Sequence, residues 1–384
     1  MASASAQVQI ISNLSQSITP LLRDTTKTDD ALEKLSGNKS GFFPAIDLRA
    51  IDGLFLGIGY KLVSDSTKGP ISVQKISAMK NLNSEAVQAK YTADFKSVFG
   101  STDVTVDAFA DIKGNILNFF GRGNDTFFDD SDGFRKFYRV KFSLFQITPA
   151  LRFNLSDQVK VTVGPSVQHS TFDPDDNTGR FINDPAIVAQ YQNLHEDKTH
   201  GGLVLNFSWD TRNNMMLPTR GVNFSVLTQA YTGLNEYSNG YAQIFPQFSV
   251  YNSLDAKGNI VLANRFGAGF TTGKTAFYQS AFLGSQDNLL GYRKFRFAGD
   301  NLIYNNLETR ISLLDIKGKR SVKAGLIGFY DVGRVWIDEE TSNSIHHGYG
   351  GGIFLSPLNR ILARIVAGFS REGMQLTAAV RQRF

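Results

Sequence analysis

The chain has 384 residues, a formal net charge of +5 at pH 7, no cysteine, 35 glycines and 31 phenylalanines. The lack of cysteine excludes disulfides, thiolate zinc sites and a cysteine nucleophile, and the small, dispersed basic excess does not favour nucleic acid as a partner. No run approaches the roughly 18 apolar residues of a membrane helix. The chain is rich in aromatic residues but has a mean hydropathy of only −0.18, a combination that fits strands in which apolar and polar residues alternate.

Residues 1–50 differ in pattern from the rest of the chain. Ile11, Leu14 and Ile18 recur at helical spacing, but Pro20 and the polar run after it break the pattern into short pieces. We therefore expect residues 1–50 to form a linker or a short helical plug. Residues 51–384 are expected to form one large domain.

From Asp52 onward, apolar residues recur at every second position. Leu54, Leu56 and Ile58 share one face of the first expected strand. Strict alternation places one face of a strand in an apolar medium and the other in a polar one. The same alternation occurs in the stretches 86–97, 137–145, 157–167 and 203–210, and most regularly in the final strand, 374–384.

A soluble β-sandwich would alternate too, but three features favour a transmembrane antiparallel β-barrel. Strands run to about 10 residues, aromatics gather near strand ends, and tight turns alternate with longer polar loops. We count about 16 strands, the least clear near 115–122. An even number places the long loops on one side and Phe384 on the tight-turn side. Tight turns are expected at 81–84, 155–157 and 356–359, and long loops at 172–198, 272–299 and 338–346.

Residues 286–300 form a stretch that is too long for a hairpin turn. Long irregular segments inside a compact fold tend to be functional. Its basic and aromatic side chains provide groups for both polar pairing and packing. These side chains are Tyr292, Arg293, Lys294, Phe295, Arg296 and Phe297.

Four motifs follow one another in the second half of the chain. They are 209–213 with 217–221, 288–293 with 296–300, 329–333, and 348–358, and the sequence closes on Phe384. In this order they resemble the bacterial surface antigen family, the BamA-type outer-membrane assembly and translocation barrels. Within it, the likeness is closest to the C-terminal barrels of outer-membrane phosphoesterase or patatin fusions.

The resemblance implies roles for individual residues. The loop at 286–300 would fold back into the barrel and dock on the strand that carries Asp331. By parity along the strands, Glu308, Arg310 and Arg364 would face the lumen with Asp331, and Phe384 would serve as the insertion signal. The docking residues implied by the likeness are Gly291, Tyr292, Arg293, Arg296, Phe329, Asp331 and Gly333.

One position departs from the family pattern. Leu290 stands where the family has an arginine that pairs with the aspartate of the receiving strand. Asp331 would then need another partner, and a charge-assisted pair would hold the loop in one geometry. We expect Arg293 or Arg296 to take that place.

Enzyme signals are weak, and we expect no catalytic activity, cofactor or metal. Asp173-x-Asp175-x-Asn177 resembles the start of a calcium loop, but Thr178 stands where the turn glycine belongs, which favours a solvated acidic loop. The five histidines lie in expected loops or at strand ends and lack metal-ligand spacing. They are His169, His195, His200, His346 and His347.

The resemblance implies a protein of the outer membrane that translocates, inserts or anchors a protein module. A seam between the first and last strands could admit other strands by edge pairing. The alternative is a passive pore partly closed by its internal loop. Implied partners are outer-membrane lipid and lipopolysaccharide, the barrel assembly machinery during insertion, and a fused or associated periplasmic or surface module.

Overall fold

The computed structural model is all-β and describes residues 8–11, 40–49, 53–66, 69–131, 133–191, 193–316, 321–338, 340–357, 362–379 and 383–384. The strands are β1 (Val8–Ile11), β2 (Gly41–Arg49), β3 (Gly53–Ser66), β4 (Gly69–Asn81), β5 (Val87–Phe99), β6 (Thr102–Asn118), β7 (Arg139–Asn154), β8 (Val159–Thr171), β9 (Lys198–Asp210), β10 (Gly221–Gly233), β11 (Tyr241–Ser253), β12 (Ile260–Gly273), β13 (Ala281–Leu283), β14 (Phe297–Gly299), β15 (Asn301–Ile316), β16 (Val322–Trp336), β17 (His346–Pro357), β18 (Ala363–Ser370) and β19 (Gly373–Ala379).

The helices of the described residues are short pieces in the connections between strands. They are α2 (Phe134–Phe137), α3 (Pro185–Val188) and α4 (Ser285–Asn288), with the 3-10 turns η1 (Asp175–Asn177), η2 (Phe181–Asn183) and η3 (Phe277–Gln279). Within the described ranges, no helix is long and apolar enough to cross a membrane.

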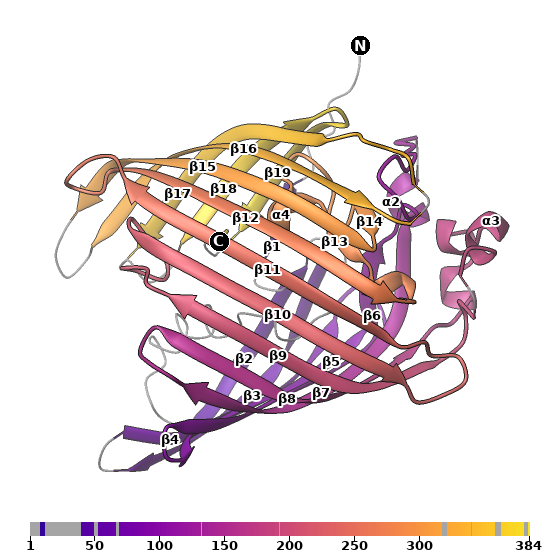
Figure 1. Cartoon of the computed structure of the whole chain (residues 1–384), viewed down its shortest axis with the longest axis horizontal. Coiled ribbons are helices and arrows are strands. Elements are labelled where there is room, and N and C mark those ends of the chain that lie inside the picture. The colour runs from indigo at the N-terminus through magenta and orange to yellow at the C-terminus, as the bar shows by residue number, and fades with distance from the viewer. Residues whose placement is uncertain are drawn as a thin grey trace.

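Among the described residues, one rolled sheet of 17 strands forms the body of the molecule (Figure 1). Eleven of them, β2–β12, and five more, β15–β19, each pair antiparallel with the next strand in this order, which agrees with the expected count of about 16. The seventeenth, β1, pairs in parallel with β19, with Val8 opposite Leu376. A separate hairpin, β13–β14, interrupts the order between β12 and β15.

The sheet begins earlier than the sequence analysis placed it. Strand β2 starts at Gly41 and pairs with β3, so the expected boundary after residue 50 is too late. Phe42 and Ile46 are exposed and Ala45 is buried, so the side chains of this strand do alternate between its two faces. The sequence does not show this alternation clearly, because Phe42 and Phe43 are adjacent apolar residues and Pro44 is unusual inside a strand. Residues 8–11 are extended rather than helical. Residues 12–39, where the expected linker or plug falls, lie outside the described residues.

Connections that follow even-numbered strands lie at one end of the sheet, because successive strands alternate in direction. This long-loop end carries the connections 119–138, 172–197, 274–300 and 337–345, and Figure 1 shows α2, α3, β13 and β14 gathered there. Two expectations are corrected. The turn at 81–84 follows β4 and also lies at the long-loop end, and the strand expected near 115–122 is the end of β6 followed by irregular chain. A register irregularity between Asp111 and Asn115 interrupts the alternation there.

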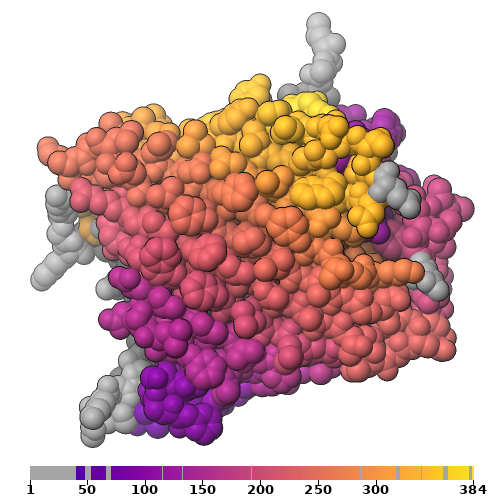
Figure 2. All heavy atoms as spheres, viewed as in Figure 1, coloured from indigo at the N-terminus to yellow at the C-terminus, as the bar shows by residue number. Residues whose placement is uncertain are grey.

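The two faces of the sheet differ in burial and chemistry. In β16, Phe329 and Asp331 are buried, whereas Leu326 and Tyr330, at alternate positions of the same strand, are each 45% exposed. Exposed apolar side chains of this kind recur along the outward face of the strands. Figure 2 shows one side of the molecule, on which the middle and C-terminal strands form most of the outer surface. An outward apolar face around a partly polar interior is the arrangement of a barrel surrounded by lipid.

Candidate functional site in the lumen

The hairpin β13–β14 carries residues 284–296, here called the internal loop. Its strands pair Ala281 with Gly299 and Leu283 with Phe297. From Asn288 to Phe297 every residue is buried, although the segment is irregular. The loop is therefore held by the surrounding strands rather than exposed to solvent.

Glycines in the wall allow the backbone of the loop to lie directly against β17 and β18. A Cβ at Gly348 would lie 1.8 Å from the Leu290 carbonyl oxygen, and one at Gly368 would lie 2.6 Å from the Gly291 nitrogen. Gly291 itself has φ of +93°, a conformation that favours glycine. The Ser370 hydroxyl donates to the Gly291 carbonyl oxygen at 2.8 Å. These contacts form a notch in the wall that receives Leu290 and Gly291.

We expect Gly348→Ala to dislodge the loop. The added methyl would meet backbone atoms that cannot rotate away, and overpacking of this kind costs about 1–3 kcal/mol. Thermal unfolding in detergent should show the loss, and planar-bilayer recordings should show a higher mean conductance. The matched control is Gly328→Ala in β16, where a Cβ meets nothing within 4 Å. Equal behaviour of the two variants would show that the notch does not hold the loop.

Asp331 is the polar anchor of the loop, but its partner is not the expected one. The carboxylate is fully buried and accepts the backbone N–H of Leu290 at 2.7 Å. Arg383, four residues beyond β19, donates to the same carboxylate through both terminal nitrogens, one of them at 2.9 Å. The expectation that Arg293 or Arg296 pairs with Asp331 is therefore wrong. The loop contributes a main-chain donor, and an arginine from the C-terminal segment supplies the charge.

Arg293 and Arg296 instead fix the loop to the long-loop end. Arg296 is 2% exposed and donates to the Glu372 carboxylate at 2.6 Å, and it also bonds the hydroxyl and the carbonyl of Thr126 at 2.6 and 2.7 Å. The guanidinium of Arg293 stacks on Phe128 and Phe134, at 4.3 and 4.7 Å from their ring centroids. Both cations lie on the half of the loop that faces the 119–138 connection, away from Asp331.

Leu290 has a packing role that accounts for its departure from the family pattern. Its side chain is 1% exposed and belongs to an apolar cluster with Ile327, Phe329 and Val366 of the wall. Leu217, from the connection between β9 and β10 at the opposite end, lies in the same cluster. An arginine here would place a charge among these apolar side chains, whereas leucine fills the site without that cost.

The remaining docking residues pack on the neighbouring strands. His346 stacks on Phe297 with 3.7 Å between the ring centroids, and Tyr292 meets the same histidine edge-on at 5.8 Å. A Cβ at Gly333 would lie 2.9 Å from Leu283, so this glycine makes room for β13. The expected docking residues thus all lie around the loop, although the polar pairing among them differs.

A charged cluster lies on the inward face of β15 and β18. Glu308 is fully buried, and its carboxylate lies 3.2 Å from Arg364 and 3.7 Å from Arg310. Arg310 also donates to the Pro218 carbonyl oxygen at 2.5 Å, which ties the cluster to the connection between β9 and β10. All three charged residues occupy the inward positions that strand parity indicates.

Phe384 lies against the inward face. Its ring is 4.8 Å from the guanidinium carbon of Arg265 and 6.2 Å from the ring of Tyr251, both of which are buried residues of the wall. Its expected role as the insertion signal stays a prediction. Among the described residues, no three histidines, cysteines or acids are grouped so that they could hold a metal ion.

Comparisons with known proteins identify the family. Residues 55–363 match the Omp85 superfamily domain. BamA from Haemophilus ducreyi lacking POTRA domains 1–3 has a similar structure, with a TM-score of 0.65 and 14% identity over 87% of this chain and 67% of that one. CdiB from Escherichia coli is similar with a TM-score of 0.53 and 12% identity over 86% of this chain and 58% of that one. These identities show the fold alone, and the chain spans little more than half of CdiB.

A search of curated proteins found no match. The expected all-β barrel, BamA-type family and outer-membrane location are confirmed, and the closer likeness to phosphoesterase or patatin fusions stays a prediction. The family match covers most of the chain, and the rolled antiparallel sheet with its apolar outward face agrees with it. The chain belongs to the Omp85 superfamily and is a β-barrel of the outer membrane.

Proposed function

We propose that this barrel translocates or inserts a polypeptide, or anchors a protein module, at the outer membrane, and that the docked internal loop keeps its lumen closed at rest. The observation that carries the proposal is the sharing of Asp331. One carboxylate accepts from Leu290 of the loop and from Arg383 beyond β19. Displacement of the C-terminal segment would remove the charged partner of Asp331 and loosen the loop.

The edge of β19 gives the proposal a second support. Val8–Ile11 pairs with this strand in parallel, so β19 accepts an additional strand on the side away from β18. An incoming polypeptide could use the same main-chain donors and acceptors by strand addition. Outer-membrane lipid, lipopolysaccharide, the assembly machinery and a fused or associated module are the partners that this role requires. That the residues lack enzyme activity stays a prediction.

Reconstituted liposomes test the proposal. An unfolded eight-stranded outer-membrane barrel serves as the client, and its folding is followed by gel mobility while conductance is recorded in planar bilayers. We expect the intact protein to speed client folding over empty liposomes and to conduct in small, brief events. Arg383→Met should alter both readouts, whereas Arg220→Met, at an exposed position, should alter neither.

Two other results would point elsewhere. A wide, steady conductance with no effect on the client would favour the passive pore. Low conductance with no effect on the client would leave anchoring as the function. The second case predicts that a fused soluble domain remains with the outer-membrane fraction after carbonate washing.

A further inference from the structure

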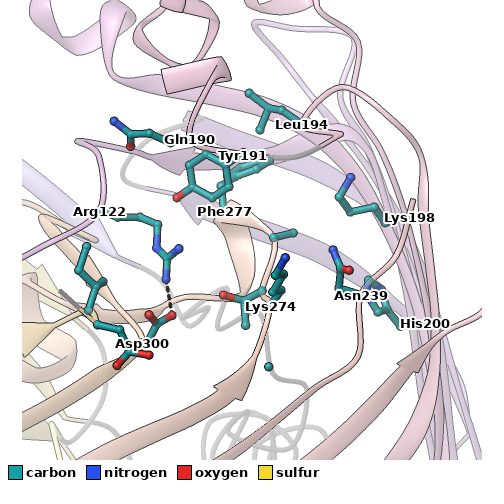
Figure 3. Close-up of a pocket in the computed structure, with 15 residues that line it drawn as sticks. Arg122, Gln190, Tyr191, Leu194, Lys198, His200, Asn239, Lys274, Phe277 and Asp300 are labelled. Atoms are coloured by element: carbon teal, nitrogen blue, oxygen red, sulfur yellow. Dashed lines mark hydrogen bonds and ion pairs between the residues drawn. The ribbon is translucent and has the colours of Figure 1, made fainter. Parts of the chain in front are cut away.

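A cavity of about 460 Å³ lies at the long-loop end, apart from the notch that holds Leu290 (Figure 3). Its walls come from five connections, which contribute Arg122, Tyr191, Asn239, Thr275 and Asp338, and from the start of β9 at His200. Ligand pockets commonly have volumes of about 300–1,000 Å³, while one water takes about 30 Å³. The space is that of an organic ligand rather than of single waters.

Several buried polar atoms around this cavity make no hydrogen bond within the described chain. They are the Tyr191 hydroxyl, the Thr275 hydroxyl, Nδ1 of His200 and Nε of Arg122. Tyr191 is only 8% exposed, and in Figure 3 its ring reaches across the cavity with the hydroxyl toward Arg122. Buried polar groups are nearly always paired in folded proteins, so four in one cavity point to a polar ligand.

The charges around the cavity are nearly balanced. Arg122 is paired with Asp300, and the Lys198 ammonium already donates to the carbonyl oxygens of Asn193 and Glu196. Asp338 and Lys274 add one charge of each sign. A strongly anionic ligand would find little uncompensated positive charge here, and a cation would find little uncompensated negative charge.

The unpaired groups both donate and accept. Burial raises the pKa of the Tyr191 phenol well above its usual range, so the hydroxyl keeps its proton. The Thr275 hydroxyl has the same dual capacity, while Arg122 can only donate. Phe277 and Leu194 supply apolar wall between these groups. A ligand ring that carries hydroxyl groups and also has apolar C–H faces would match both the polar and the apolar parts of this lining.

We propose that this cavity binds a neutral polyhydroxyl ligand, a sugar of one or two rings, with Tyr191 and Thr275 bonding its hydroxyl groups. The proposal rests on the cavity alone and is independent of polypeptide handling by the lumen. Two sources share this chemistry: a free saccharide and the sugar portion of a glycolipid.

Saturation-transfer NMR on the full chain, in a detergent without sugar headgroups, tests the binding with maltose as the probe. We expect saturation transfer to maltose, and Tyr191→Phe or Thr275→Val should each weaken binding about fivefold, as expected for the loss of one hydrogen bond. Each substitution removes a polar group at nearly constant volume. Tyr237→Phe is the control, since Tyr237 lies in the same 234–240 connection as the lining residue Asn239 but does not itself line the cavity.

Covalent labelling distinguishes the sources and checks the result independently of NMR. Lys274 is exposed and lines the cavity, so a bound ligand should slow its acylation relative to Lys257, an exposed residue at the opposite end. Protection by maltose or by lipid-free core oligosaccharide indicates a free saccharide, and protection only by intact lipopolysaccharide in nanodiscs indicates a glycolipid. Equal protection in Tyr191→Phe, stronger protection by inorganic phosphate, or no protection by any sugar would overturn the proposal.

Discussion

Asp331→Ala should convert a barrel with small, brief conductance events into one with large, stable openings. The substitution removes the acceptor for the Leu290 N–H and leaves the Arg383 guanidinium buried without its carboxylate. Breaking a buried ion pair by removing one partner typically costs about 3–5 kcal/mol. Single-channel recording in planar bilayers measures the opening, and urea unfolding in detergent measures the lost stability.

Two comparisons make this prediction specific. Arg383→Met removes the cation but leaves the bond from Leu290 to Asp331, so its conductance should rise less than that of Asp331→Ala. Asp315→Ala, at an exposed position in β15, should behave like the unaltered protein. If Asp331→Ala conducts as the unaltered protein does, the notch alone holds the loop and the carboxylate does not.

Glu308→Gln should destabilise the barrel by about 3–5 kcal/mol, because it leaves two buried guanidinium groups without their shared carboxylate. Arg364 and Arg310 are each 3% exposed and lie 3.2 and 3.7 Å from Glu308. The loss should appear as a lower urea midpoint with an unchanged slope. Conductance should change less than in Asp331→Ala, since Glu308 makes no bond to the internal loop among its described contacts.

A second substitution tests the electrostatic origin of this effect. Glu308→Gln combined with Arg364→Met removes one of the stranded cations, so the double variant should be more stable than the single one. Glu85→Gln is the surface control, because its carboxylate is 86% exposed and pairs with Lys113 at 3.7 Å, where solvent screens the charges. A cost for Glu308→Gln no larger than that of this control would indicate a hydrated lumen.

Alternation made most of the wall predictable from sequence. In a strand with lipid on one side and the lumen on the other, every second residue faces lipid and is apolar. Strand β16 around Asp331 is an example. The pattern failed where the chain leaves that environment. Gly41–Arg49 contains a proline and two adjacent phenylalanines, and residues 119–122 turn away from the sheet at an irregularity in β6.

The polar pairing of the site could not be predicted in the same way. A buried aspartate such as Asp331 is expected to pair with an arginine. The alternation of residues along a strand does not indicate which arginine lies close to it. Arg383 reaches Asp331 from beyond β19, whereas Arg293 and Arg296 are turned toward Phe128 and Glu372 by the path of the loop. Glycine is a signal that could have been used, since Gly348 and Gly368 lie where the loop backbone contacts the wall.

The meeting of Leu217 and Leu290 in one apolar cluster has an electrical consequence. One residue enters from each end, so an ion passing this part of the wall would meet apolar side chains from both ends. Such an ion would shed hydration without receiving compensating ligands, which is the principle of a dewetted gate.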